Sequence, residues 1–434
     1  MFAETLPLGY IETTFQRALR TREATVGILP SSELATQEDR LSQYKKLRSL
    51  VYSVVPLISR IEANGSAILS NYQSFRPSGS HYDPVYFETF DTLENKYGLI
   101  RPGDDVYEVT SGSAGISCAW LANRLGCNAH IYVPASLPTG RKQEMINFGA
   151  ILEEVGGENS YVPEASRAET RAFVKDAKNT GHLESGSLQN EDFNLYYARR
   201  EDGHTMCLIN HSENGITPRS MEDILAQVYS AIPDGVTIDN ILSIIGNGSS
   251  STGLYRAREK YFPQARLVGI ENYDSAVLFR EKYPERAKKL GLVYKPQKMF
   301  GSIIPGMKLP FVDQTMFDEI RLVDTKQMES RMRSHNSNRA VIEWIGMSSA
   351  SSMIVAEGLA KENPGSVTLS IVYDGGYRYG EPVVATKEYD QTAETVNYRR
   401  MPRHAPWIQY PSKDLASMPH NIAQVYNRVS WGKS

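Results

Sequence analysis

A loop of eight small residues, 246–253, is the segment whose composition is best suited to chemistry. It reads Gly-Asn-Gly-Ser-Ser-Ser-Thr-Gly and lies between an apolar run at residues 241–245 and an expected helix at 254–261. Small residues let the backbone approach phosphate oxygens, and the N-terminus of a helix attracts negative charge. Leu254 stands where a Walker motif needs lysine, and the glycine spacing is not that of a dinucleotide-binding loop. The sequence therefore favours a phosphate-binding loop of another kind.

A second loop, Thr110-Ser111-Gly112-Ser113-Ala114-Gly115, separates an expected strand at residues 106–110 from an expected helix at 116–125. Its N–H groups and hydroxyls suit a small anion, although strand-to-helix turns also favour glycine and serine on geometric grounds. A serine hydrolase is disfavoured, because its nucleophile elbow needs glycine two residues before the serine and Ser111 occupies that place. The histidines near the interesting loops, His81, His204 and His211, have no cysteine or acid at a metal-ligand spacing, so we expect no metal site.

The elements that must position these loops alternate along the chain. Expected strands cover residues 66–72, 106–110, 129–133, 151–155, 241–245, 266–270 and 367–373, and expected helices cover 116–125, 140–148, 254–261 and 349–361. Strands that alternate with helices predict crossover units and mostly parallel sheets. The two series predict an α/β protein of two layers, preceded by a helical arm at 1–48 and followed by an extension at 381–434.

The composition limits the classes of protein to which the chain can belong. Its 434 residues are too many for one compact core, 41% are hydrophobic and 22% are charged, as in an ordinary soluble enzyme. A net charge of −3 gives no electrostatic reason for nucleic acid or an anionic membrane as the main partner. Three widely spaced cysteines argue against a disulfide framework, and neither a signal peptide nor a membrane span is expected. These features predict a cytoplasmic protein.

The order of the motifs is more specific than any one of them. The series consists of Pro77-Ser78-Gly79-Ser80-His81-Tyr82 and the stretches 110–115, 246–253, 270–275, 346–350 and 374–379. It resembles the fold-type II pyridoxal-phosphate enzymes, which include cysteine synthase, cystathionine β-synthase and the tryptophan synthase β chain. The resemblance covers roughly residues 50–380 and implies a homodimer. It also implies a large cofactor-binding domain at 49–83 and 190–380 and a small domain at 84–189.

The resemblance implies a role for each matching residue. The cofactor phosphate would be held by Gly246, Asn247, Gly248, Ser249 and Ser250, and the pyridine nitrogen by Ser348. The carboxylate of an amino-acid substrate would be bound by Thr110, Ser111, Gly112 and Ala114. No role follows for the stretches 189–191 and 211–215, which match less well.

Two positions depart from the family pattern. Tyr82 stands where the family has the lysine that forms an imine with the cofactor, and Ser113 stands where it has an asparagine that touches the cofactor's 3′-oxygen. Both lie at the aldehyde end of the expected cofactor, whereas the phosphate loop and Ser348 are kept. A phenol has an ordinary pKa near 10, so Tyr82 would act as a hydrogen-bond donor, or as an acid or base if nearby cations lowered its pKa.

The leading hypothesis is a divergent cysteine synthase-like enzyme that acts on an amino acid or a similar small molecule. It would use β-elimination or β-replacement, with pyridoxal phosphate held without a covalent link and with Tyr82 and Ser113 as catalytic residues. Two alternatives stay open. One is an enzyme on the same scaffold that has lost the cofactor, and the other is a non-catalytic binding or regulatory homologue.

Overall fold

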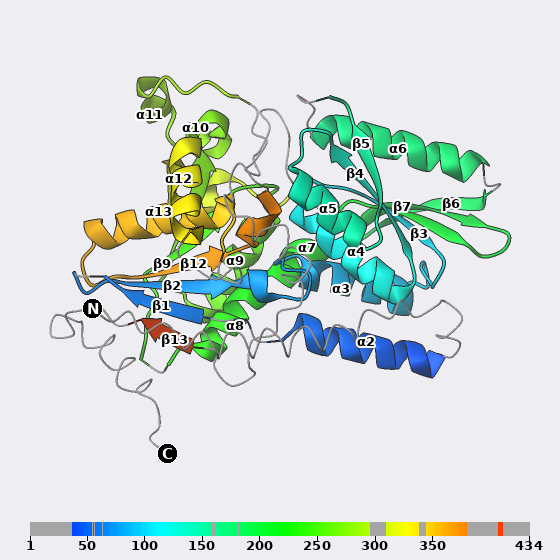
Figure 1. Ribbon diagram of the computed structural model, residues 1–434, viewed down its shortest axis with the longest axis horizontal. Helices are drawn as coiled ribbons and strands as arrows, with labels where there is room; N and C mark the ends of the chain where they lie inside the picture. Colours follow the sequence, from blue (N-terminus) through cyan, green and yellow to red (C-terminus); the bar gives the residue numbers. More distant parts are fainter. Residues whose placement is uncertain are drawn as a thin grey trace, which may run out of the picture.

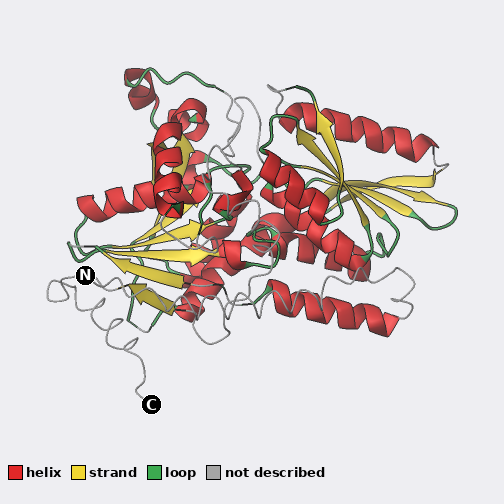
Figure 2. Cartoon of the chain, in the orientation of Figure 1, coloured by secondary structure: helices red, strands yellow, loops and turns green. Residues whose placement is uncertain are grey.

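The computed structural model describes residues 37–53, 55, 57–62, 64–157, 162–179, 182–233, 235–295, 310–337, 344–379 and the backbone of 407–410. The first 36 residues of the expected arm lie outside this part of the chain, and so does the expected C-terminal extension except for residues 407–410. Figure 1 shows two lobes, each built around a sheet, and Figure 2 shows that helices lie on the outside of both. The predicted two-domain α/β architecture is therefore confirmed.

The larger sheet has seven strands, five of which form a parallel core. In spatial order they are β11 (Glu319–Val323), β10 (Arg266–Asn272), β9 (Asn240–Ile244), β12 (Val367–Val372), β2 (Ala67–Tyr72), β1 (Leu57–Ile61) and β13 (Trp407–Tyr410). β1 runs antiparallel to β2, and β13 runs parallel to β1. Every residue of β2, β9 and β12 is buried, as a parallel sheet covered on both faces requires.

Helices pack on both sides of this sheet. α12 and α13 pack together on one side, and α8 and α9 pack together on the other (Figure 1). The helices of this domain are α7 (Ile216–Met221), α8 (Asp223–Ala231), α9 (Ser249–Tyr261), α10 (Val277–Lys282), α11 (Pro284–Lys289), α12 (Thr325–Asn336) and α13 (Met347–Glu362). Short helical turns are η1 (Gln73–Phe75), η3 (Tyr273–Ser275), η4 (Gln314–Met316) and η6 (Gly376–Tyr379). The predicted helices at 254–261 and 349–361 are thus confirmed as parts of α9 and α13.

The smaller sheet has six strands, parallel at one edge and antiparallel at the other. In spatial order they are β5 (Ile151–Val155), β4 (Asn128–Pro134), β3 (Asp105–Val109), β8 (Thr205–Ile209), β7 (Asn194–Arg200) and β6 (His182–Gln189). β7 and β8 belong to this sheet, so the expected boundary at residue 190, which assigned them to the large domain, is wrong. The physical reason is pairing: β7 returns antiparallel on β6 and then bonds to β8, which carries the chain into the sheet's centre.

The helices of the small domain cover the two faces of its sheet. Tyr107 and Phe173 share one apolar cluster, which places α6 (Val162–Asn179) on one face. Val106 and Ile131 instead pack with α4 (Ser113–Leu125) and α5 (Thr139–Asn147) on the other. The cysteines Cys118, Cys127 and Cys207 are free and buried, as expected for small core residues.

The described part of the expected arm is a helix, α2 (Gln37–Val51), which packs against α3 (Asp83–Asp91). Tyr44, Leu47 and Val51 of α2 lie in the small domain's apolar core. A π-helical turn, η2 (Thr92–Lys96), follows α3, and its Glu94 forms an ion pair with Arg40 of α2, Nε to Oε1 2.5 Å. The helix predicted within the arm is confirmed, and it is anchored to the small domain.

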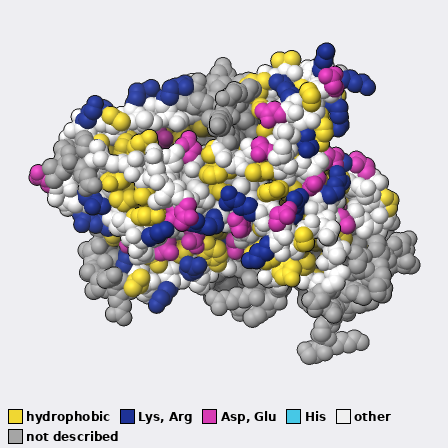
Figure 3. Space-filling view, turned by 180° about the vertical axis from the view of Figure 1, so that it is seen from behind, with side chains coloured by type: hydrophobic (Ala, Val, Ile, Leu, Met, Phe, Trp, Pro, Cys, Tyr) yellow, Lys and Arg dark blue, Asp and Glu magenta, His cyan; other side chains and the backbone are white. Residues whose placement is uncertain are grey.

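The surface of the molecule carries charges of both signs. On the face seen in Figure 3, Lys and Arg side chains alternate with Asp and Glu over the described residues, without a continuous basic stripe. Within the described ranges, no helix is long and apolar enough to cross a membrane.

Candidate active site

The predicted stretches 77–82, 110–115, 246–253, 346–350 and 374–379 come together between the two domains, and Tyr82 lies among them. The Tyr82 ring packs against the apolar clusters of both domains. Ser80 pairs with Asp374 in an isolated antiparallel bridge, and Ile345 pairs with Gly375 in another, so the Tyr82 segment and the residues before α13 both pair with residues 374–375. The Asn247 amide Nδ2 donates to the Tyr82 hydroxyl at 3.3 Å, which joins the phosphate loop to the same place.

The loop before α9 has the shape of an anion cradle. Gly248 adopts φ +91°, and a Cβ at this position would lie 2.3 Å from Cγ1 of Val312, so only glycine fits. α9 begins at Ser249, whose N–H donates to Asn247 Oδ1 at 3.1 Å. The Ser249 hydroxyl is buried and has no hydrogen-bond partner among the described residues. A buried hydroxyl with spare capacity beside a helix N-terminus fits a phosphate group.

The hydroxyl of Ser250 has a partner within the protein. It is directed to the sulfur of Met221 at 3.7 Å, which leaves the backbone N–H as the group that Ser250 offers to an anion. Gly246 is half-buried at the end of β9, where the chain turns into the loop. That these residues hold a cofactor phosphate stays a prediction, and the geometry fits it.

The second loop is shaped by its own threonine. Thr110 Oγ1 accepts hydrogen bonds from Gly112 N at 2.9 Å and from Gly115 N at 3.3 Å, so this hydroxyl organises the loop. Gly112 adopts φ +149°, and a Cβ there would lie 2.7 Å from Cδ of Arg141. Arg141 in turn donates from Nη1 to the Ser111 carbonyl at 2.8 Å. The N–H groups at the start of α4, including that of Ala114, are the donors that remain for a substrate carboxylate.

Ser113 belongs to a polar cluster that sequence reasoning did not assign. Its hydroxyl donates to Asp374 Oδ2 at 3.0 Å and accepts from Arg378 Nη1 at 3.4 Å. The Tyr379 hydroxyl donates to the same carboxylate at 3.3 Å, and Arg141 lies 3.7 Å from it. Asp374 therefore joins the Ser113 loop to the large domain, and the motif at 374–379 was the only signal of this in the sequence.

Ser348 lies in the first turn of α13 and is half-buried. The preceding Gly346 is held close to Asp374, because a Cβ on it would lie 2.1 Å from Asp374 Oδ1. The helix start that carries Ser348 thus lies beside the Ser113–Asp374 cluster. Its role at the pyridine nitrogen stays a prediction.

Tyr82 has a different electrostatic environment from the one that base catalysis needs. Burial raises the pKa of its phenol to about 12, and the nearby negative charge of Glu108 adds to this, whereas the hydrogen bond from Asn247 acts in the opposite direction. Among the described residues, the groups that shift this pKa include no cation, so the condition for an ionisable phenol is not met there. At neutral pH Tyr82 is a neutral hydroxyl that can donate a hydrogen bond.

Sequence reasoning missed a buried acid–histidine pair beside Tyr82. Glu108, fully buried on β3, lies 3.1 Å from Nδ1 of His211 and accepts a hydrogen bond from the Tyr86 hydroxyl at 2.9 Å. The His211 ring contacts the Tyr82 ring edge-on, with 5.4 Å between centroids. A glutamate inside an otherwise buried strand was the available signal, since buried carboxylates need a specific partner.

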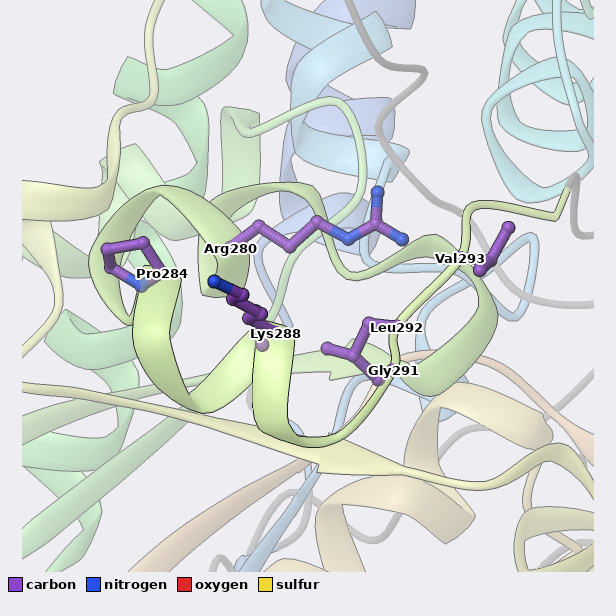
Figure 4. A pocket seen from close by; sticks show the side chains of 7 residues that line it. Arg280, Pro284, Lys288, Gly291, Leu292 and Val293 are labelled. Carbon is purple, nitrogen blue, oxygen red and sulfur yellow. The ribbon is translucent and has the colours of Figure 1, made fainter.

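A surface hollow elsewhere on the large domain is separate from these loops. It lies on α10 and α11 and is lined by Arg280, Pro284, Ala287, Lys288, Gly291, Leu292 and Val293, several of which are shown in Figure 4. None of these is among the loop residues above. No cluster of metal-ligating side chains occurs in the described ranges either.

The chain is similar to known proteins over most of its length. The family described as pyridoxal-phosphate dependent enzyme matches residues 52–374. Cysteine synthase of Staphylococcus aureus is 24% identical over 328 residues, which cover 75% of this chain and 91% of that protein. O-ureido-L-serine synthase of Streptomyces lavendulae is 21% identical and covers 74% of this chain and 86% of that protein.

The fold is also found in solved structures. The crystal structure of O-ureido-L-serine synthase matches with a TM-score of 0.61 at 18% identity, covering 79% of this chain and 94% of that one. Since the family match spans most of the chain and includes the Tyr82 segment and both Gly-Ser loops, the chain belongs to the pyridoxal-phosphate dependent enzymes, with the fold-type II architecture of the cysteine synthase group.

Proposed function

We propose that this protein acts on an amino acid or a similar molecule by β-elimination or β-replacement, with pyridoxal phosphate held non-covalently. The observation that carries the proposal is the 3.3 Å contact between the Tyr82 hydroxyl and Asn247. This contact joins the Tyr82 phenol to the loop suited to the cofactor phosphate, and the family resemblance aligns Tyr82 with the lysine that forms the imine. A phenol offers no amine for a covalent link.

The chain's own residues would divide the work of binding. The α9 N-terminus, Gly248 and Ser249 would hold the phosphate, and Ser348 would face the pyridine nitrogen. The α4 N-terminus would bind the substrate carboxylate, since the positive end of a helix favours an anion. When bound, the cofactor supplies an electron sink for charge at the substrate's α-carbon. Tyr82 would donate a hydrogen bond in this site, because its pKa of about 12 keeps it protonated.

The names of the relatives support an amino-acid substrate. Cysteine synthase and O-ureido-L-serine synthase are both named for an amino-acid product. The expected homodimer is part of the same proposal, and light scattering of the purified protein tests it.

The visible absorption spectrum of protein purified with added pyridoxal phosphate tests the proposal. We expect retained cofactor after gel filtration, with a free-aldehyde spectrum that changes when one class of amino acid is added. Cofactor retained without any response would point to a binding or regulatory homologue. No retained cofactor would overturn the proposal and favour the cofactor-free enzyme.

A further inference from the structure

With Tyr82 in place of the family's lysine, the site lacks the amine that would carry protons. A series of hydrogen-bonded polar side chains lies beside Tyr82. The series begins at the buried Glu108 and passes through His211 to the hydroxyl of Ser212. It ends at Asn247, whose Nδ2 donates both to Ser212 Oγ at 3.2 Å and to the Tyr82 hydroxyl at 3.3 Å. The hydroxyls of Ser212 and Tyr82 therefore lie on either side of one amide nitrogen.

The hydrogen bonds that Glu108 accepts favour one tautomer of His211. Glu108 accepts from the Tyr86 hydroxyl at 2.9 Å and from Val109 N at 3.0 Å, so its carboxylate acts as an acceptor. His211 Nδ1, 3.1 Å away, then carries the proton in that hydrogen bond. The other ring nitrogen, Nε2, is left as an acceptor and lies 3.5 Å from Ser212 Oγ. Such contacts are long in ligand-free enzymes and tighten when substrate binds.

Ser212 is suited to donate to this nitrogen. Its Oγ already accepts a hydrogen bond from Asn247, which leaves the hydroxyl proton free to face His211 Nε2. Ser212 is half-buried, whereas Glu108 and His211 are buried, so the chain of groups leads from the interior toward the site. An acid, a histidine and a hydroxyl in this order are the parts of a general-base relay.

We propose that Glu108, His211 and Ser212 form a proton relay that serves the reacting end of the site in place of the absent lysine amine. This inference rests on the proposed function. Ser212 Oγ takes a proton from the substrate while its own proton passes to His211 Nε2. The imidazolium that forms keeps its Nδ1 proton on the Glu108 carboxylate, which stabilises it. The reverse transfer returns the proton, so no other reactant is needed.

The surroundings of His211 distinguish it from His81, which also contacts the Tyr82 ring. The ionisable groups around His211 are Glu108, Tyr86, Tyr82 and His81. His81 also contacts the Tyr82 ring, with 4.3 Å between centroids, but its Nδ1 faces the carbonyl of Tyr373 and no carboxylate. Burial lowers the pKa of His81 to about 3, so this ring stays neutral. Of these two described histidines, His211 is the one with both a buried carboxylate and a hydroxyl partner.

Nitrogen NMR of 15N-histidine-labelled protein tests the relay without cofactor or turnover. We expect His211 to carry its proton on Nδ1, and we expect Ser212→Ala to move the Nε2 resonance because it removes that nitrogen's donor. Ser212→Ala deletes one hydroxyl from a half-buried residue and should leave the fold intact. His204→Asn is a matched control, since His204 also pairs with a carboxylate, Asp105 at 2.8 Å, far along the sheet. It should leave the His211 signals unchanged.

Exchange of the substrate's α-hydrogen with solvent deuterium gives a second readout in the cofactor-loaded protein. We expect Ser212→Ala and His211→Gln to lower the exchange rate by about 10²-fold or more, the usual worth of general-base catalysis. His204→Asn should retain the wild-type rate. Absorption at the cofactor band, measured on the same samples, separates a lost relay from lost cofactor.

Either of two results would overturn the relay. One is a His211 proton on Nε2 in the wild-type protein, because that nitrogen could not then accept from Ser212. The other is an exchange rate that Ser212→Ala and His211→Gln leave unchanged. Failure of the wild-type protein to retain cofactor would instead count against the proposed function, and the NMR result would still decide the geometry.

Discussion

Nε of Arg378 lies 2.7 Å from Oε2 of Glu144, and this ion pair joins the two domains beside the Ser113 loop. Neither side chain is exposed by more than 4%. Glu144 belongs to α5 of the small domain, and Arg378 belongs to η6 at the end of the large domain. Arg378 also donates to the Ser78 carbonyl and to Ser113 Oγ, so one guanidinium holds α5, the Tyr82 segment and the Ser113 loop together.

Glu144→Gln should therefore destabilise the protein markedly. Removing one partner of a buried pair leaves an uncompensated charge and costs about 3–5 kcal/mol. Urea unfolding measures the loss. The matched control is Glu154→Gln. Glu154 pairs at 2.5 Å with Lys142, which lies on the same helix as Glu144, but Glu154 is 49% exposed. An exposed pair contributes about 1 kcal/mol or less. Equal losses in both variants would contradict the assigned role of Arg378.

Tyr82→Lys should convert the site from non-covalent to covalent cofactor binding. A lysine amine can bond to the aldehyde of pyridoxal phosphate, and a phenol cannot. After borohydride reduction, we expect mass spectrometry of digested Tyr82→Lys protein to find the cofactor attached at position 82. The wild-type protein and Tyr82→Phe should carry none there. A variant that retains cofactor without becoming labelled would show that position 82 does not face the aldehyde.

Gly248→Ala should weaken cofactor binding while leaving the two domains folded. Its Cβ would meet Val312 at 2.3 Å and would push the loop away from the anion site. We expect the dissociation constant for pyridoxal phosphate to rise at least about 10-fold, which corresponds to about 1.4 kcal/mol. Gly103→Ala is the control, because Gly103 has φ +94° but open space around its Cβ. It carries the same backbone strain and should bind the cofactor normally.

The fold was largely predictable because its central strands are local apolar runs. The expected strand at 241–245 coincides with β9 to within one residue, and β12 and β2 were found equally well. β7 was missed because most of Asn194–Arg200 is only partly buried, and its place depends on pairing with β6 and β8 rather than on its own pattern. The local composition of a segment does not show which distant segment it pairs with.

The candidate site was predictable only where its chemistry is local. The Gly-Ser loops can be recognised from their composition, and the family resemblance implied that they share one site with Tyr82. His211 and Glu108 are 103 positions apart and come together only because β8 lies beside β3. Likewise, Glu144 and Arg378 come from different domains. One sequence shows the types of these residues but not their contacts.

Glu169 should make the protein less stable as the pH rises. It lies on α6, is 3% exposed, and its Oε1 has no hydrogen-bond partner among the described residues. Burial raises its pKa from 4.5 to about 9, and the charge of Glu108 contributes. Below its ordinary pKa both the folded and the unfolded chain hold the proton, so this stability is fully present. As the pH rises toward the folded-state pKa, the unfolded chain releases the proton first, and the stability is lost.

Glu169→Gln cannot ionise and should remove this dependence. Between mild acid and neutral pH, the stability difference between the two proteins should shift in favour of Glu169→Gln by about 3 kcal/mol. The reason is that each pH unit above the ordinary pKa costs the wild-type protein about 1.4 kcal/mol of folding stability. Urea unfolding at about pH 5 and about pH 8 measures the change. Glu201→Gln, at an exposed position, should follow the wild type at both values. If Glu169→Gln also runs parallel to the wild type, the buried carboxyl is not held in its protonated form.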